Sequence, residues 1–255
     1  GPVAIPGQMS VAAAQYAEDV VNKNGGINGK KLEVFIEDYA YDAKRAIPAY
    51  QALKTKGANY IIFEGSPAAG AVAPLAKQNK DLLITGVTTL PSYTDGDPLT
   101  CRIGLTADNY GPAIAKYITD KKTNARVAFI VPTTDYGKGI ETKTTSALTP
   151  LGATVVDIET YDQISGDYRT QIAKLKSLQN KIDYIVLIHT ASTIESLLKQ
   201  MKELGLNKPI ITDGVTAANP TLKDKSLVEG MVIADDQYTP AVQQTDSEMV
   251  KTFKE

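Results

Sequence analysis

Two loops rich in hydroxyl groups are the part of this sequence whose residue types could do chemistry. They follow two short apolar runs, residues 60–63 and 82–84, within the stretch YIIFEGSPAAGAVAPLAKQNKDLLITGVTTLPSYT. The first loop carries Ser66, and the second carries Thr88 and Thr89. Hydroxyl groups and free backbone N–H groups at the start of a helix bind oxyanions. The sequence therefore predicts a site for a carboxylate.

The elements around these loops must place them side by side. Short apolar runs are typical of buried parallel strands, and the alanine-rich segment between the two runs predicts a crossover helix. Adjacent parallel strands end at the same edge of a sheet, so the loops at residues 64–66 and 86–89 should face one crevice, where open α/β sheets bind ligands.

Ser66 before Pro67 predicts a helix N-cap followed by a first-turn proline. The simpler interpretation is that Ser66 only caps its own helix and that Thr88 and Thr89 satisfy their own turn. Pro74 falls inside the predicted helix and should kink it or shift its start.

The second half of the chain offers further candidates at strand ends. Asp213 could bind an ammonium group, or form a turn before the following glycine. Tyr136 could contact a ligand, or pack at the top of its helix. His189 and Thr190 could line the cleft, although a lone histidine at a strand end is more often structural. Glu64 could meet a polar ligand group, or point to solvent.

Composition excludes several classes of function. The chain has 255 residues, a net charge of −2 and 22% charged residues without a basic block, which argues against nucleic acid or a membrane surface as a partner. No apolar run is long enough to span a bilayer, and no signal peptide begins the chain. One cysteine and one histidine argue against an internal disulfide, a metal site or a histidine-based triad. We expect no cofactor.

The hydrophobic pattern predicts alternating strands and helices along the whole chain. In the first half we expect a loop at 1–7, helices at 8–24 and 42–56, strands at 32–37 and 102–105, and the two strands and helix of the hydroxyl-rich stretch. In the second half we expect helices at 110–121, 139–151, 167–179 and 193–204 and strands at 126–131, 154–158, 184–188, 210–211 and 231–234. Mainly parallel sheets with helices on both faces follow, in two halves joined without a flexible linker.

Several stretches in a characteristic order resemble one family. These are GPVA at the first residue, NKNGGINGKKLEVFIED at 22–38, GSPAAGAVAPLA, ITGVTTLPSYT, GPAIAKYI from 111, DYGKG at 135–139, DYRTQIAKLK from 167 and LLKQMKELGL ending at 206. In these stretches the chain resembles type I periplasmic solute-binding proteins of the leucine/isoleucine/valine-binding kind. The resemblance implies a clamshell of two Rossmann-like lobes that closes over a ligand.

The resemblance also implies roles for individual residues. Ser66 and Thr89 of lobe I would hold an α-carboxylate, with backbone help from Val87. Asp213 of lobe II would hold the α-ammonium group, and Tyr136 would contact the ligand from the same lobe. Three positions depart from the family pattern: Pro6, Glu64 and Thr190. These departures favour an aromatic or aliphatic carboxylate, amide or urea-like solute as an alternative ligand.

On this basis we expect lobe I at 1–106, with 238–255 returning to it, and lobe II at 107–237. Hinges are expected at 105–108 and 237–240. Relative to the family, lobe I is expected to be incomplete at both chain ends, which would leave apolar faces of its sheet unpaired.

The expected function is delivery of a small amino acid, branched-chain or similarly amphipathic, to the membrane permease of an ABC importer. The expected location is the periplasm or the cell exterior, with or without a lipid anchor. A receptor ectodomain is one alternative. An enzyme is another, but the sequence has no GxSxG, GxxxxGK[ST] or GxGxxG motif, and we expect no catalytic residues.

Overall fold

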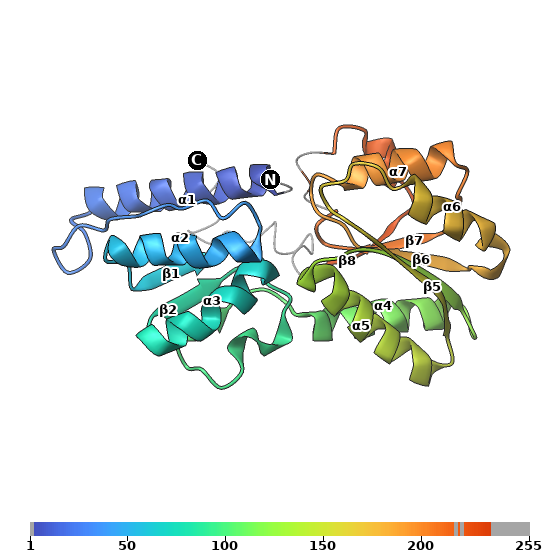
Figure 1. Cartoon of the computed structure of the whole chain (residues 1–255), viewed down its shortest axis with the longest axis horizontal. Coiled ribbons are helices and arrows are strands. Elements are labelled where there is room, and N and C mark those ends of the chain that lie inside the picture. The colour runs from blue at the N-terminus through green and yellow to red at the C-terminus, as the bar shows by residue number, and fades with distance from the viewer. Residues whose placement is uncertain (1–2, 217–218, 220–221, 236–255) are drawn as a thin grey trace.

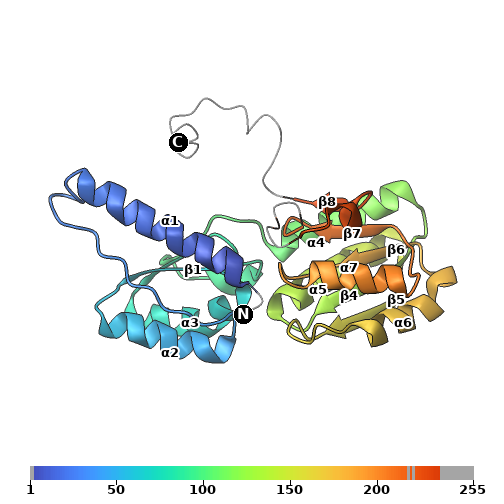
Figure 2. The same ribbon diagram turned by 90° about the horizontal axis from the view of Figure 1, so that it is seen from above.

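The computed structural model describes residues 3–216, 219 and 222–235, which form two α/β bodies lying side by side (Figures 1 and 2). The N-terminal body contains α1 (Ala4–Lys23), α2 (Ala43–Thr55), β1 (Tyr60–Phe63), α3 (Ser66–Asn79), β2 (Leu82–Thr85) and β3 (Thr100–Arg102). The C-terminal body contains α4 (Ala107–Lys121), β4 (Arg126–Pro132), α5 (Asp135–Leu148), β5 (Thr154–Tyr161), α6 (Arg169–Ser177), β6 (Tyr184–Leu187), α7 (Ile194–Glu203), β7 (Ile210–Asp213) and β8 (Val232–Ala234). Short 3-10 turns lie at Pro91–Thr94, Thr149–Leu151, Gln179–Lys181 and Lys225–Val228.

The N-terminal sheet has the strand order β1-β2-β3, and both strand pairs are parallel. Ile61 and Leu83 point to one face, where they join a core with α2 and α3. In the described part of the chain the opposite, apolar face of this sheet is uncovered, as expected. Its side chains Tyr60, Ile62 and Ile103 are 79%, 74% and 82% exposed. Parallel pairing brings the ends of β1 and β2 to the same edge, which positions the two hydroxyl-bearing loops.

The C-terminal sheet has the strand order β5-β4-β6-β7-β8, again with every pair parallel. Helices α4 and α5 cover one face and α6 and α7 cover the other (Figure 1). Val127 and Phe129 of β4 join the α4–α5 side, whereas Ala128 and Ile130 join the α6–α7 side. This double burial explains why the strand is a continuous apolar run rather than an alternating one.

Most expected elements are confirmed, with ends that shift by a few residues. Helix α4 begins at Ala107 rather than at 110, because the Thr106 side chain and Asn109 form a capping box there. Helix α5 begins at Asp135 rather than at 139, because the Thr134 hydroxyl accepts a hydrogen bond from the Gly137 amide. The third strand of the N-terminal sheet lies at Thr100–Arg102 instead of 102–105. The expected second hinge and the returning segment, 237–240 and 238–255, lie outside the described residues.

The N-terminal segment corrects two predictions. Residues expected to form a loop at 1–7 are instead helical from Ala4 onward. The predicted strand at 32–37 is not a strand, because side chains of α1 take up its backbone groups. The Asn22 side chain accepts from the Leu32 amide at 2.8 Å and donates to the Leu32 carbonyl at 2.9 Å, and Glu18 accepts from the Val34 amide at 3.3 Å.

The start of α3 corrects the predicted role of Ser66. Gly65, not Ser66, is the N-cap, and Ser66 is the first helical residue, with no hydrogen bond that caps the helix. Gly65 has φ 96° and ψ 145°, a conformation essentially restricted to glycine. A Cβ at this position would also overlap Tyr41 Cε2 and lie 3.0 Å from the Tyr39 hydroxyl oxygen. Pro74 lies within α3, which nevertheless continues from Ser66 to Asn79.

We therefore expect Gly65→Ala to lower the free energy of unfolding by about 2–4 kcal/mol, through backbone strain and overlap with Tyr41. Gly70→Ala is the matched control, since a Cβ at Gly70 meets only Leu90 Cδ2, at 3.8 Å, and alanine favours a helix interior by up to about 1 kcal/mol. Urea unfolding of both variants measures the difference. Equal stability of the two variants would contradict the tight packing at Gly65.

Candidate functional site

The two hydroxyl-bearing loops meet, as the sequence predicted. Ser66 Oγ accepts from Thr88 Oγ1 at 3.1 Å and from the Thr89 amide at 3.3 Å, and it lies 3.4 Å from Thr89 Oγ1. All three side chains are buried, with 1%, 2% and 9% exposure for Ser66, Thr88 and Thr89. We call these residues the hydroxyl cluster. Because Ser66 does not cap its own helix, the simpler interpretation of that residue is wrong.

The backbone ties the two loops together. The Gly65 amide donates to the Val87 carbonyl at 2.6 Å, so the start of α3 and the loop after β2 are held in one arrangement. The Val87 amide donates to Thr85 Oγ1 at 3.3 Å, and the Val87 side chain is 54% exposed. The positive end of the α3 dipole and the hydroxyl cluster together favour an anion at this edge.

A buried acid lies at the end of β7 in the C-terminal body. Asp213 is 2% exposed, and its Oδ2 accepts from the Tyr136 hydroxyl while its Oδ1 accepts from the Val215 amide at 3.2 Å. Burial raises the pKa of the Asp213 carboxyl to about 7, while hydrogen bonds from Tyr136, from the Val215 backbone and from its own backbone lower it and the charge of Asp235 raises it. Among the residues that the structure describes, Asp213 receives hydrogen bonds but forms no ion pair with a cation.

Two other predicted residues are occupied by protein contacts. His189 is fully buried, with Nε2 at 2.6 Å from Thr216 Oγ1 and Nδ1 at 3.0 Å from the Thr190 carbonyl. Burial lowers the pKa of His189 to about 4, so its ring is neutral at pH 7. Thr190 is 3% exposed and packs its hydroxyl against Thr193 Oγ1 at 3.4 Å.

Glu64 is half-buried beside the hydroxyl cluster. Its Oε1 accepts from Ser10 Oγ of α1 at 2.9 Å, and its carbonyl accepts from the Tyr39 hydroxyl. Glu64 therefore links α1 and the segment before α2 to the loop that carries Ser66, and it does not simply point to solvent.

Sequence reasoning missed Tyr41, which connects the two halves of the site. Burial raises the pKa of its phenol, and the charges of Asp213, Glu64 and Asp135 raise it further. Its ring touches Gly65, next to Ser66. Contacts between α3 and α5 and a hydrogen bond of 2.9 Å from the Ala107 amide to the Thr89 carbonyl also join the bodies here. Tyr41 is therefore a residue of the N-terminal body that contacts the loop carrying Ser66 and is influenced by the charge of Asp213 in the C-terminal body.

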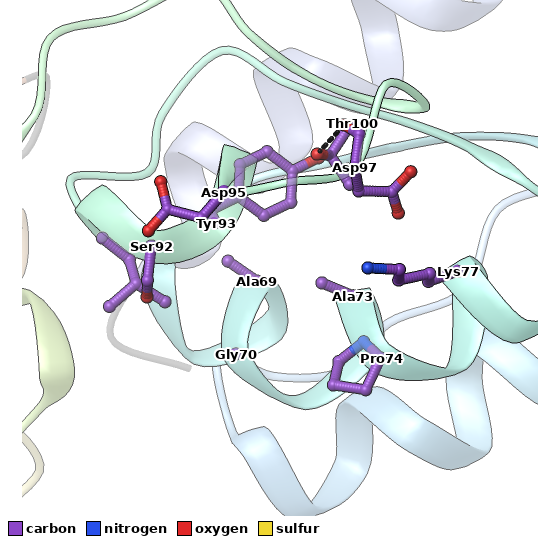
Figure 3. Close-up of a pocket in the computed structure, with 11 residues that line it drawn as sticks. Ala69, Gly70, Ala73, Pro74, Lys77, Ser92, Tyr93, Asp95, Asp97 and Thr100 are labelled. Carbon is purple, nitrogen blue, oxygen red and sulfur yellow. Dashed lines mark hydrogen bonds between the residues drawn. The ribbon is translucent and has the colours of Figure 1, made fainter.

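A separate hollow of about 310 Å³ lies on the N-terminal body between α3, the turn at Pro91–Thr94 and β3 (Figure 3). Small residues of α3, including Ala69, Gly70 and Ala73, form one wall, and Tyr93 and Asp97 lie opposite. None of the residues predicted for the site lines it.

Within the described ranges, no group of three or more His, Cys, Asp or Glu side chains could hold a metal ion. No helix in this part of the chain has the length and apolar character needed to cross a membrane.

Comparison with known proteins adds the family. A family model described as periplasmic binding protein matches residues 1–255. The leucine-, isoleucine-, valine-, threonine- and alanine-binding protein of Pseudomonas aeruginosa is 30% identical over 239 residues, covering 91% of this chain, which spans only 62% of that relative's length.

Two solved structures share the fold. A leucine-binding protein from Thermotoga maritima has a TM-score of 0.80 at 22% identity, over 91% of this chain and 67% of its own. A solute-binding protein from Rhodopseudomonas palustris in complex with 3,4-dihydroxybenzoic acid has a TM-score of 0.77 at 24% identity, over 91% and 64%. With two bodies of parallel sheet and a family model that matches its whole length, the chain belongs to the periplasmic binding protein family.

Proposed function

We propose that this chain is the solute-binding component of an ABC importer and that it binds a small amino acid, branched-chain or similarly amphipathic, between its two bodies. The observation that supports the proposal is that the hydroxyl cluster and Asp213 lie on different bodies, with Tyr41 in contact with Gly65 beside Ser66 and influenced by the charge of Asp213. The names of the relatives in this family support the same ligand class.

The chemistry of the two halves matches the two ends of an amino acid. Ser66, Thr88 and Thr89 at the start of α3 bind the α-carboxylate through hydroxyl and amide donors. Asp213 pairs with the α-ammonium group, a cation that the buried carboxylate does not receive from the described part of the chain. A ligand that carries both charges stabilises both halves at once.

The domain organisation follows from this proposal. Residues 1–106 belong to lobe I and residues 107–237 to lobe II. A ligand that touches both lobes shifts the equilibrium toward the closed form, because it binds that form more tightly. The protein works in the periplasm or outside the cell and passes its ligand to a membrane permease. No step of this role needs catalysis.

A carboxylate without an ammonium group is a second candidate ligand. A pKa near 7 allows Asp213 to be protonated at mildly acidic pH, and a neutral carboxyl with the Tyr136 hydroxyl beside it can bond to a polar, uncharged group. The same fold holds an aromatic acid in the Rhodopseudomonas palustris protein. Glu64 is an additional polar group near the site.

Leucine and 4-methylpentanoate, which differ only in the ammonium group, separate the two candidates. We expect Asp213→Asn to weaken leucine binding about 100-fold, because the ammonium group loses its ionic partner. Binding of 4-methylpentanoate should change little. Ser66→Ala is the matched control, since it removes part of the carboxylate subsite and should weaken both ligands. Isothermal titration gives each affinity, and an equal loss of both ligands in Asp213→Asn would contradict the role of Asp213.

Leucine affinity should also depend on pH. Because the pKa of the ligand-free Asp213 is about 7 and the ammonium group binds its ionised form, the dissociation constant should rise about tenfold for each pH unit below 7. Above pH 7 the affinity should level off. Titrations between pH 5 and 8 test this, with Asp213→Asn as the variant that should show a flat profile. A flat profile in the unmodified chain would argue against an ion pair at Asp213.

Closure can be followed separately by small-angle scattering. Addition of a saturating ligand should reduce the radius of gyration, since the bound form holds both bodies together. Ser66→Ala at the same ligand concentration provides a partly saturated comparison. Tight binding with no compaction would count against closure while leaving the ligand assignment intact.

A further inference from the structure

The segment that precedes α2 has an unusual backbone. Ala40 and Tyr41 have φ values of 52° and 59°, so two consecutive residues other than glycine lie in the left-handed region, at a cost of about 1–2 kcal/mol each. Such strain persists only where neighbouring contacts enforce it, and it often accompanies a functional position. In this segment the left-handed backbone conformation sets the direction in which the Tyr41 side chain leaves the chain.

Contacts on both sides hold this segment in place. The Asp38 carboxylate accepts from the Ala40 amide at 2.7 Å, and Asp42 caps α2 by accepting from the Lys44 amide at 2.8 Å. The Tyr39 hydroxyl donates to the Glu64 carbonyl, which attaches the segment to the loop before α3. The rings of Tyr39 and Tyr41 lie 6.2 Å apart and are inclined at 34°.

The Tyr41 ring occupies the space where a side chain at position 65 would lie. A Cβ on Gly65 would overlap Cε2 and lie 3.1 Å from Cδ2 of this ring. Gly65 immediately precedes Ser66, so the ring contacts the residue next to the first member of the hydroxyl cluster. Tyr41 is half-buried, so part of the residue remains exposed.

Charged groups of the C-terminal body act on the same residue. After burial, the charge of Asp213 is the largest cause that raises the pKa of Tyr41, and Tyr41 in turn contributes to the raised pKa of Tyr136. Asp135, at the start of α5, acts on Tyr41 as well. A ligand that reached from Ser66 to Asp213 would pass this ring.

We propose that the Tyr41 ring is a wall of the ligand site and determines specificity by limiting the size of the ligand's side chain. This inference rests on the proposed function. The strained backbone and the contact with Gly65 prevent the ring from moving aside. Branched aliphatic ligands then fit, and ligands with an aromatic side chain are excluded by overlap. Within the described residues the Tyr41 hydroxyl makes no hydrogen bond to protein, so the effect is assigned to the ring.

Affinities for two ligand pairs test this inference. The first pair is leucine and phenylalanine, and the second is 4-methylpentanoate and 3-phenylpropanoate, which lack the ammonium group. In Tyr41→Ala and Tyr41→Leu we expect the preference for the smaller member to fall by at least about tenfold, because the wall is removed. Tyr41→Phe keeps the ring and should keep the preference. Tyr60→Ala, which removes a tyrosine ring that is 79% exposed on the same body, is the matched control.

The outcomes separate the inference from the proposed function. Thermal unfolding first confirms that each variant is folded. If Tyr41→Ala does not fold, Tyr41→Leu replaces it in the comparison. If the unmodified chain binds only the pair without ammonium groups, the amino-acid assignment fails, but the change of preference in that pair still decides the role of Tyr41. An unchanged preference in Tyr41→Leu, or an equal change in Tyr41→Phe, overturns the inference. An unmodified chain that binds neither pair overturns both.

Discussion

Parallel pairing of β1 with β2 is the constraint on which the site depends. Two parallel strands end at the same edge, so the loops that follow them start side by side whatever their sequences. The hydrogen bond from the Gly65 amide to the Val87 carbonyl then fixes their spacing. This spacing brings Ser66 within reach of Thr88 and Thr89, and the three buried hydroxyl groups lie within hydrogen-bonding distance of one another at the start of α3.

Glycine at position 65 is the local condition for the same arrangement. Its backbone conformation lets the chain enter α3 one residue earlier than a Ser-Pro sequence suggests, since the Gly65 carbonyl already accepts from the Ala69 amide at 3.3 Å. Ser66 is thereby released from capping and turned toward the other loop. The missing side chain at Gly65 also leaves room for the Tyr41 ring. Gly65 therefore permits both the position of Ser66 in the hydroxyl cluster and the position of the Tyr41 ring.

The sequence was sufficient for those features that periodicity and strand order determine. Apolar runs such as residues 126–131 predicted the strands, and strand order predicted that Ser66 and the threonines would meet. The prediction of a strand at 32–37 failed because the Asn22 side chain, instead of a neighbouring strand, bonds to the backbone of Leu32. Sequence reasoning also failed to find Tyr41, because no local pattern signals that two residues other than glycine will adopt a left-handed conformation. That conformation is imposed by contacts with the distant Glu64 and Gly65.

His189 and Asp213 show why burial alone does not make a ligand site. Burial disfavours the charged form of both, so the pKa of His189 falls to about 4 and that of Asp213 rises to about 7. The neutral histidine ring has a protein partner at each nitrogen, and a ligand would have nothing to add there. Asp213 accepts hydrogen bonds from Tyr136 and Val215, but no cation of the described ranges balances its charge, and the charge of Asp235 raises its pKa. Of these two buried groups, only Asp213 would be stabilised by a positively charged ligand, which is the physical reason to prefer an amino acid over a simple acid in this site.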